Sequence, residues 1–182
     1  VTIGTVYQPH SALTLSADVF LTDIDDRIMP TGYIASWNLA GLSPQAAAVL
    51  LANKVDGAVY FTNAVSTRTQ GLDLRLDYKH SFANSTRLKL AGAYHRSSTR
   101  ITAVNAAPSV LGVQMTDLIL DANTRMTMER GQPQDSIKLW GRFETSAYDL
   151  VLNLNRFGVF SSTKGSEQVD FGAKWTLDAE LN

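Results

Sequence analysis

The sequence of 182 residues contains no cysteine, which excludes a disulfide framework and a thiolate metal site. It also lacks a long apolar run. The longest, Ala46 to Ala52, is far below the roughly 18 residues that a membrane-spanning helix needs. The net charge of −1 provides no overall attraction to nucleic acid, so no nucleic-acid partner is expected. A membrane β-barrel is not excluded, because its strands are apolar on one face only.

An initiating methionine and a signal peptide are also missing. The chain begins at Val1 and stops within the strand-like pattern from Leu177 to Asn182. We therefore expect a fragment of a longer protein, other parts of which carry much of the function.

The dominant positive signal is alternation with a period of two residues, which is typical of strands with two different faces. The first clear case has apolar residues at every second position from Leu13 to Leu21, and polar residues between them except at Phe20. Similar patterns recur along the chain. They predict about seven strands, near residues 1–7, 13–22, 72–78, 87–95, 137–144, 148–155 and 169–180.

Several of these segments reach about ten residues, the length of a tilted strand that crosses a bilayer. One face of each is apolar, and the other carries charges of both signs, as at Asp73 and Arg75. Aromatic residues fall near strand ends, where membrane girdles occur, at Tyr78, Tyr94, Tyr148 and Trp175. The pattern predicts an all-β fold, namely an antiparallel up-and-down transmembrane β-barrel segment with a polar, water-filled lumen.

The connections alternate between short and long. Short turns are expected at residues 8–11, 81–85 and 144–146, and long loops at residues 29–56, 104–133 and 161–168. Long loops on one side are typical of outer-membrane barrels, where they are extracellular. The first loop contains a predicted helix near residues 44–54, because Ser43 can cap it and Pro44 suits its first position.

Four phrases in this order resemble one family. Residues 17–28 (ADVFLTDIDDRI) are followed by residues 59–73 (VYFTNAVSTRTQGLD), then by Glu129–Pro133 and Asn155–Gly158. They are similar to ascending and descending strands of TonB-dependent outer-membrane receptors. The resemblance covers nearly the whole chain, so residues 1–182 are interpreted as a C-terminal part of such a barrel.

The resemblance implies about seven strands of a 22-stranded barrel in the outer membrane of a Gram-negative cell. It also implies a plug domain, and a periplasmic segment through which TonB acts, although neither matches anything in this sequence. Members of the family import scarce ligands such as ferric siderophores, cobalamin, haem, sugars or peptides. Nothing in these residues selects among them.

Four residues are candidates for contact with a ligand or with the plug. Arg68 and Gln70 are expected to point into the upper lumen, and the alternative is that they pair with neighbouring wall residues. Tyr33 and Trp37 lie in the first long loop, where an aromatic ring could stack on a ligand. The alternative for both is packing within the loop.

Metal and catalytic sites are not expected. His10, His80 and His95 are scattered without ligand spacing. The acidic group Asp23, Asp25 and Asp26 lacks the glycine of a calcium loop. The sequence has no nucleophile elbow, P-loop or dinucleotide fingerprint, so neither an enzyme nor a cofactor is predicted. Gly71 is expected to mark a bulge or a close backbone approach. Met115, Met126 and Met128 are expected to fill a small core in the second long loop, or to offer an adaptable apolar surface.

Three other kinds of protein fit parts of the pattern. A passive porin has the same alternation, and a soluble β-sandwich binding module would pack the same leucines inward. A membrane-barrel hydrolase needs a nucleophile near a base, and none is apparent in the sequence. An isolated segment is not expected to fold alone, because the two edges of the sheet would stay unpaired in lipid.

Overall fold

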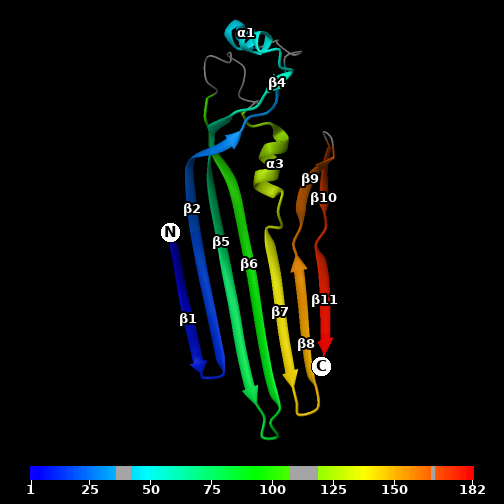
Figure 1. Cartoon of the computed structure of the whole chain (residues 1–182). Helices are drawn as coiled ribbons and strands as arrows, with labels where there is room; N and C mark the ends of the chain where they lie inside the picture. Colours follow the sequence, from blue (N-terminus) through cyan, green and yellow to red (C-terminus); the bar gives the residue numbers. More distant parts are fainter. Residues whose placement is uncertain (36–41, 107–118, 165–166) are drawn as a thin grey trace. The chain divides into compact units, whose positions relative to one another are not determined.

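The computed structural model describes residues 1–35, 42–106, 119–164 and 167–182. Within these residues, seven strands form one antiparallel sheet in the order β1-β2-β5-β6-β7-β8-β11 (Figure 1). Their bounds are β1 (Thr2–His10), β2 (Leu13–Pro30), β5 (Phe61–Ser81), β6 (Arg87–Val104), β7 (Asp135–Glu144), β8 (Asp149–Phe157) and β11 (Lys174–Leu181). The strands follow one another in chain order, which confirms the predicted up-and-down wall. The sheet is open, with β1 and β11 at its edges.

The chain divides into two compact units, which are described separately. Unit 1 comprises residues 1–22, 69–98 and 130–182, and unit 2 comprises residues 23–68 and 99–129. Unit 1 contains the short turns and most of the paired strand length. Unit 2 contains the segments that the sequence assigned to the first two long loops, together with parts of β2, β5 and β6.

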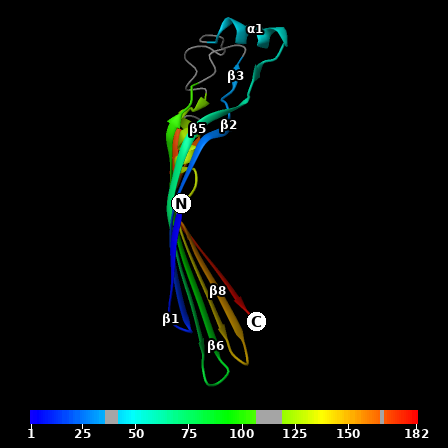
Figure 2. The ribbon, with the colours of Figure 1, turned by 90° about the vertical axis from the view of Figure 1, so that its left-hand side faces the viewer.

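The strand register of unit 1 places like residues opposite one another. Tyr7 faces Leu15 across β1 and β2, and Leu154 faces both Leu139 on β7 and Leu177 on β11. Each such pair lies on the same side of the sheet, because side chains alternate along a strand. Figure 2 shows β1, β6 and β8 diverging from one another, the twist expected of a β-sheet.

The large apolar residues of unit 1 are exposed. Leu74, Leu90, Leu139 and Leu152 expose 40–45% of their surface, and Leu177 exposes 67%. Among the described residues, the buried hydrophobic side chains all belong to unit 2. A soluble sandwich would bury these leucines between two sheets. That alternative is therefore wrong, and the single apolar layer fits a wall that faces lipid.

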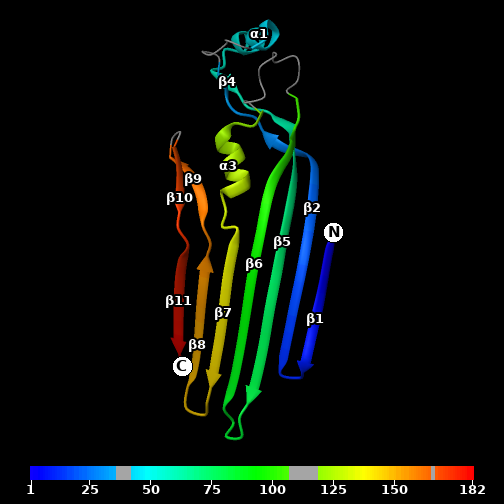
Figure 3. The same ribbon diagram turned by 180° about the vertical axis from the view of Figure 1, so that it is seen from behind.

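The last predicted loop and strand need correction. Residues 161–168 were expected to form a loop, but β9 (Phe160–Lys164) and β10 (Glu167–Phe171) pair as a hairpin, seen side by side in Figure 3. The strand expected at 169–180 is interrupted between Phe171 and Lys174. The period-two pattern continues through Gly172 and Ala173, so alternation alone does not reveal the interruption.

The described residues of unit 2 form two helices and a small hairpin. Helix α1 (Pro44–Ala52) lies where the sequence predicted a helix, and the Ser43 hydroxyl accepts a hydrogen bond from the Ala46 amide. Strands β3 (Ile34–Ala35) and β4 (Gly57–Ala58) pair on either side of it. Helix α3 (Ala122–Arg130) was not predicted. Its signal is Asp121, whose carboxylate accepts from the Thr124 amide as a helix cap does.

The core of unit 2 is small. Ala64 and Val65 on β5 are fully buried and cluster with Ile119 and Leu120. Met128 packs against this cluster. This agrees with the prediction that the methionines of the second long loop fill a small core. Met115 lies outside the described residues. The described end of the second predicted loop therefore packs against β5.

Candidate functional site

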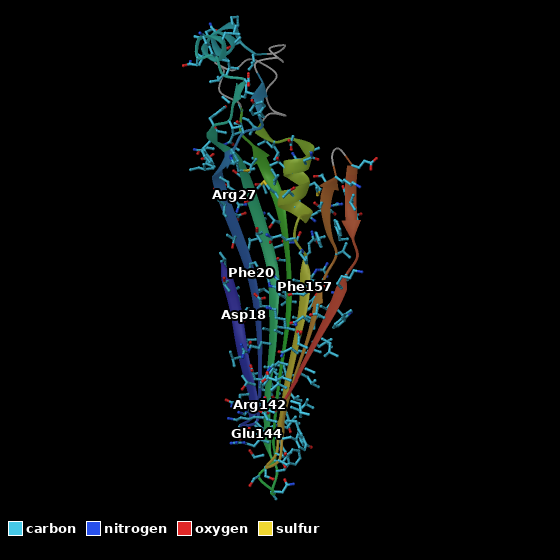
Figure 4. The ribbon with its side chains drawn as sticks, turned by 45° about the vertical axis from the view of Figure 1, so that its right-hand side comes forward. Asp18, Phe20, Arg27, Arg142, Glu144 and Phe157 are labelled. Atoms are coloured by element: carbon cyan, nitrogen blue, oxygen red, sulfur yellow. The ribbon has the colours of Figure 1, made fainter. Side chains whose placement is uncertain are left out.

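The candidate site is one face of the unit 1 sheet, called the polar face. The register aligns Lys89 with Arg142, and Trp140 with Asn153. Figure 4 labels Asp18, Phe20, Arg142, Glu144 and Phe157, all of which belong to this face. Its other members include Arg87, Lys89, His95, Lys138, Asp149, Asn155, Lys174, Thr176, Asp178 and Glu180.

Ion pairs cross the polar face near the short turns. Arg142 contacts Asp149 through two hydrogen bonds of 2.9 and 2.6 Å, and Arg87 pairs with Glu144. Bidentate guanidinium–carboxylate contacts are strongly directional. They tie β6 to β7 and β7 to β8, so this end of the face is a cross-linked charged surface.

Further along the polar face, a group of five residues explains the break in the sequence pattern. Phe20 lies against Gly71, where an added Cβ would be 2.2 Å from its Cζ atom. The same ring is stacked with the imidazole of His95, at 6.3 Å between centroids. His95 Nδ1 lies 2.6 Å from Asp73, and its Nε2 lies 3.1 Å from the Ser97 hydroxyl. The expected close approach at Gly71 is confirmed, and an aromatic at position 20 has a packing reason.

A polar hollow of about 490 Å³ adjoins this group. It is lined by Asp18, Asp73, Arg75, His95, Ser136 and Lys138, among others. Its charges are mixed, with two carboxylates and two basic side chains. The hollow therefore suits water or a polar molecule rather than an apolar one.

The opposite face is called the apolar face. Leu15, Leu74, Leu90 and Leu139 line a wide hollow of about 870 Å³ on it, where Gly92 provides no side chain. The apolar stretch ends where Arg96 faces Asp135, and Asp135 pairs with Arg156. Charge on a lipid-facing surface is costly in the hydrocarbon region. The three charged residues therefore mark one boundary of the apolar band.

The predicted site residues lie in or next to unit 2. Arg68 donates to both oxygens of Asp23, at 2.7 and 3.3 Å. Gln70 is exposed and lies two residues along the same strand. Within β5, alternation puts both on the side of Leu72 rather than of Asp73. This is the side opposite the polar face, whereas both residues were expected to point into the lumen.

Tyr33 and Trp37 were expected to be accessible aromatic residues. Tyr33 is 53% exposed, and its ring lies close to Gly57, where an added Cβ would be 2.5 Å from Cζ. Packing within the β3–β4 hairpin thus accounts for one side of the ring and leaves the other accessible. Trp37 lies outside the described residues.

The acidic residues of β2 have separate contacts. Asp23 pairs with Arg68, and Asp26, with a φ of 52°, accepts a hydrogen bond from Asn105. Within residues 1–35, 42–106, 119–164 and 167–182, no group of His, Asp and Glu could hold a metal ion. His10 lies at a turn, where its Nδ1 accepts from the Ala12 amide.

Tyr60 and Asp170 have perturbed pKa values. Burial raises the pKa of Tyr60 above its ordinary value, because the phenolate would lose hydration. Hydrogen bonds from Gln168 and then Ser161 lower the pKa of Asp170 by stabilising its carboxylate. The hydrogen bond from Ser161 to Asp170 joins β9 to β10. In the same hairpin Phe160 stacks on Phe171, with 4.8 Å between the ring centroids.

The open sheet with one polar and one apolar face defines a class of protein, the outer-membrane β-barrel. Among the described residues, no helix is long and apolar enough to cross a membrane. The family model described as "TonB dependent receptor-like, beta-barrel" matches residues 1–182. The chain belongs to this family, and its place is the outer membrane.

One solved structure shows the same fold. It is the outer membrane transporter YddB from Escherichia coli, with a TM-score of 0.62 and 11% identity. The match covers 99% of this chain and 25% of that chain, so this chain spans about a quarter of the length of YddB. Comparison of the sequence with curated proteins gives no match.

The structure brings together residues that sequence reasoning did not connect. Asp73, His95 and Ser97 come from two strands, so no local motif contains all three. The available signal was Phe20, the one apolar residue on the polar side of the segment from Leu13 to Thr22. Such an exception indicates a specific contact, but its partners become visible only with the strand register.

Proposed function

We propose that this chain forms about seven strands of the 22-stranded barrel of a receptor for TonB-energised uptake. The main observation in support of this proposal is that the receptor family model matches all 182 residues. A wall with a charged inner face and an apolar outer face supports the same conclusion. The remainder of the parent chain would supply the other strands, the plug domain and the segment that TonB engages.

In this proposal the two faces have different tasks. The apolar face holds the barrel in lipid, and the polar face contacts water and the plug. Mixed charges and side-chain hydrogen bonds suit contact with a folded domain, because they are satisfied only by complementary groups. The excursions of unit 2 and the β9–β10 hairpin belong to the extracellular side, where a ligand first arrives.

The ligand is a scarce small molecule, such as a ferric siderophore or cobalamin. Tyr33 and Trp37 are proposed as contacts for the ligand or the plug, and Gln70 is proposed as a contact for the ligand. Tyr33 offers an exposed aromatic surface for stacking, and Gln70 offers an exposed amide. Arg68 is proposed in the same role, with its pairing to Asp23 as the competing structural role.

Gene deletion and complementation test the uptake function. Cells that lack the gene are grown on a panel of ferric siderophores, cobalamin and haem at limiting concentration, and uptake of the labelled compound is measured. Loss of uptake of one compound is expected, with rescue by the intact gene only when TonB is functional. Rescue that persists without TonB would contradict energised uptake.

A conductance measurement separates the receptor from the passive porin. The full-length protein is reconstituted in a planar lipid bilayer. A barrel filled by a plug is expected to conduct ions poorly until denaturant removes the plug. A large, steady conductance of the untreated protein would favour the porin.

A further inference from the structure

The triad of Asp73, His95 and Ser97 on the polar face has the bonding order of an activated serine. Asp73 Oδ1 lies 2.6 Å from His95 Nδ1, and Ser97 Oγ lies 3.1 Å from His95 Nε2. Both distances lie in the range of side-chain hydrogen bonds. The two ring nitrogens are thus engaged by different partners, an acid on one side and a hydroxyl on the other.

The identity of the partners fixes the roles of the nitrogens. An ionised carboxylate only accepts hydrogen bonds, so Asp73 selects the tautomer that has its proton on Nδ1. The Nε2 lone pair then faces the Ser97 hydroxyl and can take its proton. This is the arrangement in which a histidine acts as the general base for a nucleophilic hydroxyl.

The surroundings hold the imidazole and leave it accessible. The ring of Phe20 is nearly parallel to the imidazole, with 15° between the planes and 6.3 Å between the centroids. The side chains of His95 and Asp73 remain 42% and 49% exposed. His95 also lines the polar hollow together with Ser136 and Lys138. A small polar molecule can therefore reach the group.

We propose that Ser97 is an activated nucleophile that accepts an acyl group from small polar esters in the lumen. The Oγ atom attacks the ester carbonyl carbon while His95 Nε2 takes the hydroxyl proton. The carbon–oxygen bond to the leaving alcohol then breaks, and His95 returns the proton to that alcohol. Water from the lumen, deprotonated by His95, subsequently attacks the acyl carbon. The bond to Ser97 Oγ then breaks, and His95 returns the proton to Oγ, which releases the carboxylic acid and regenerates Ser97.

The strand environment sets the expected rate. The backbone N–H of Ser97 donates to Gln134 O at 2.8 Å, so it cannot stabilise the oxyanion of the intermediate. Removing one such donor costs about 100- to 1000-fold in other acyl-transfer sites. Lys138 and Ser136 line the hollow with His95 and supply hydrogen-bond donors there. The site is therefore suited to esters with good leaving groups, and acylation is easier to detect than turnover.

The test is acetylation of the full-length receptor in detergent by p-nitrophenyl acetate, followed by peptide mass spectrometry. Ser98 is the matched internal control, because it is adjacent in sequence but lies on the opposite face of β6. Acetyl-Ser97 is expected to form about 100-fold faster than acetyl-Ser98, the lower end of what a general base contributes. Equal acetylation of the two serines would overturn the proposal.

Three variants identify the roles within the triad. Ser97→Ala should abolish the acetylated peptide, and His95→Ala should slow it about 100-fold, with partial recovery when free imidazole is added. Asp73 acts through His95, so Asp73→Asn should slow acetylation while Asp73→Glu restores part of it. Asp178→Asn, on the polar face of β11, is the control and should leave the rate unchanged. Unaltered acetylation of Ser97 in His95→Ala would refute the general-base role.

The fold of each variant is checked by the gel-mobility shift of the unheated barrel. Should His95→Ala fail to fold, His95→Gln provides the same comparison, because its amide can hydrogen-bond but cannot act as a base. Uptake of the transported compound is measured in parallel. Unchanged uptake in Ser97→Ala is compatible with both proposals, so failure of acyl transfer is distinguishable from failure of the receptor function.

Discussion

The ring of Phe20 on β2 occupies the space that a side chain at residue 71 on β5 would need. A Cβ placed on Gly71 would lie 2.2 Å from Phe20 Cζ and 2.7 Å from the carbonyl oxygen of Arg96. Backbone cannot move aside as a flexible side chain can. We predict that Gly71→Ala destabilises the full-length barrel by about 1–3 kcal/mol, the usual cost of overpacking, measured by urea unfolding in lipid vesicles.

Two variants test whether a steric clash at residue 71 causes the loss of stability. Gly172 has open space around its Cβ position, so Gly172→Ala should leave the unfolding free energy nearly unchanged. Phe20→Ala should relieve part of the clash, and the double variant should therefore be less unstable than the two single effects added together. Strict additivity would show that Phe20 is not the obstructing group.

An arginine on the apolar face of β8 should destabilise the barrel much more than an arginine on the polar face of the same strand. Leu152 lies on the apolar face and is 41% exposed, whereas Asn153 lies on the polar face opposite Trp140. Leu152→Arg should destabilise the barrel by about 2–4 kcal/mol, the cost of an arginine near the middle of a bilayer. Asn153→Arg should cost far less, because its side chain reaches water. Unfolding in vesicles measures both, and similar costs would contradict the assignment of the faces.

The Arg68–Asp23 ion pair gives a test of the two roles proposed for Arg68. If Arg68 acts only as a wall partner, Arg68→Gln, Asp23→Asn and the double variant should impair uptake equally. We predict instead a larger loss of ligand affinity for Arg68→Gln than for Asp23→Asn, because Arg68 is proposed to contact the ligand in addition to Asp23. Ligand titration of the purified receptor measures this difference, and equal effects would assign Arg68 to the wall alone.

Aromatic contact by Tyr33 is tested in the same titration. Tyr33→Ala removes the accessible ring and should weaken ligand binding about tenfold, the equivalent of about 1.4 kcal/mol for a stacked aromatic. Tyr33→Phe keeps the ring and should bind nearly as the native protein does. The matched control is Tyr148→Ala at a short turn. Weakening by that control as well would indicate a general effect on the fold.

Acid should loosen the β9–β10 hairpin through Asp170. The pKa of Asp170 is lowered from its ordinary 3.8 by hydrogen bonds from Gln168 and Ser161, so folding favours the ionised form. Its contribution is fully present above pH 3.8 and is lost as pH falls through the lowered pKa. Amide exchange in β9 and β10, corrected for the intrinsic rate, should accelerate over this range. Asp170→Asn should remove the pH dependence, and Asp178→Asn should retain it.

Much of the wall could be predicted because its physics is local. A strand between lipid and water needs apolar and polar side chains in alternation. Segments such as Leu13–Leu21 and Tyr148–Leu154 have an apolar residue at every second position. The helix at Pro44 was also predictable, since Ser43 provides a capping hydroxyl and proline suits the first turn. In both cases the determining contacts lie within a few residues.

The interruption after Phe171 and the grouping of Asp73 with His95 could not be predicted in this way. The first depends on where a hairpin leaves the main sheet, and the alternation continues through Gly172 without a break. The second depends on strand register, because the two residues are 22 positions apart. Alternation tells which face a side chain occupies, but it does not tell which neighbour lies beside it.

The β3–β4 pairing has a consequence for how such a receptor can diversify. Ala35 and Gly57 are partners in the register, so the chain leaves and re-enters the hairpin at adjacent points. The intervening segment, including α1, can therefore be lengthened, shortened or exchanged without altering the register on either side. During evolution, this segment can therefore acquire new recognition surfaces while the β3–β4 pairing stays the same. For engineering it marks residues 36–56 as the place to graft a foreign binding loop.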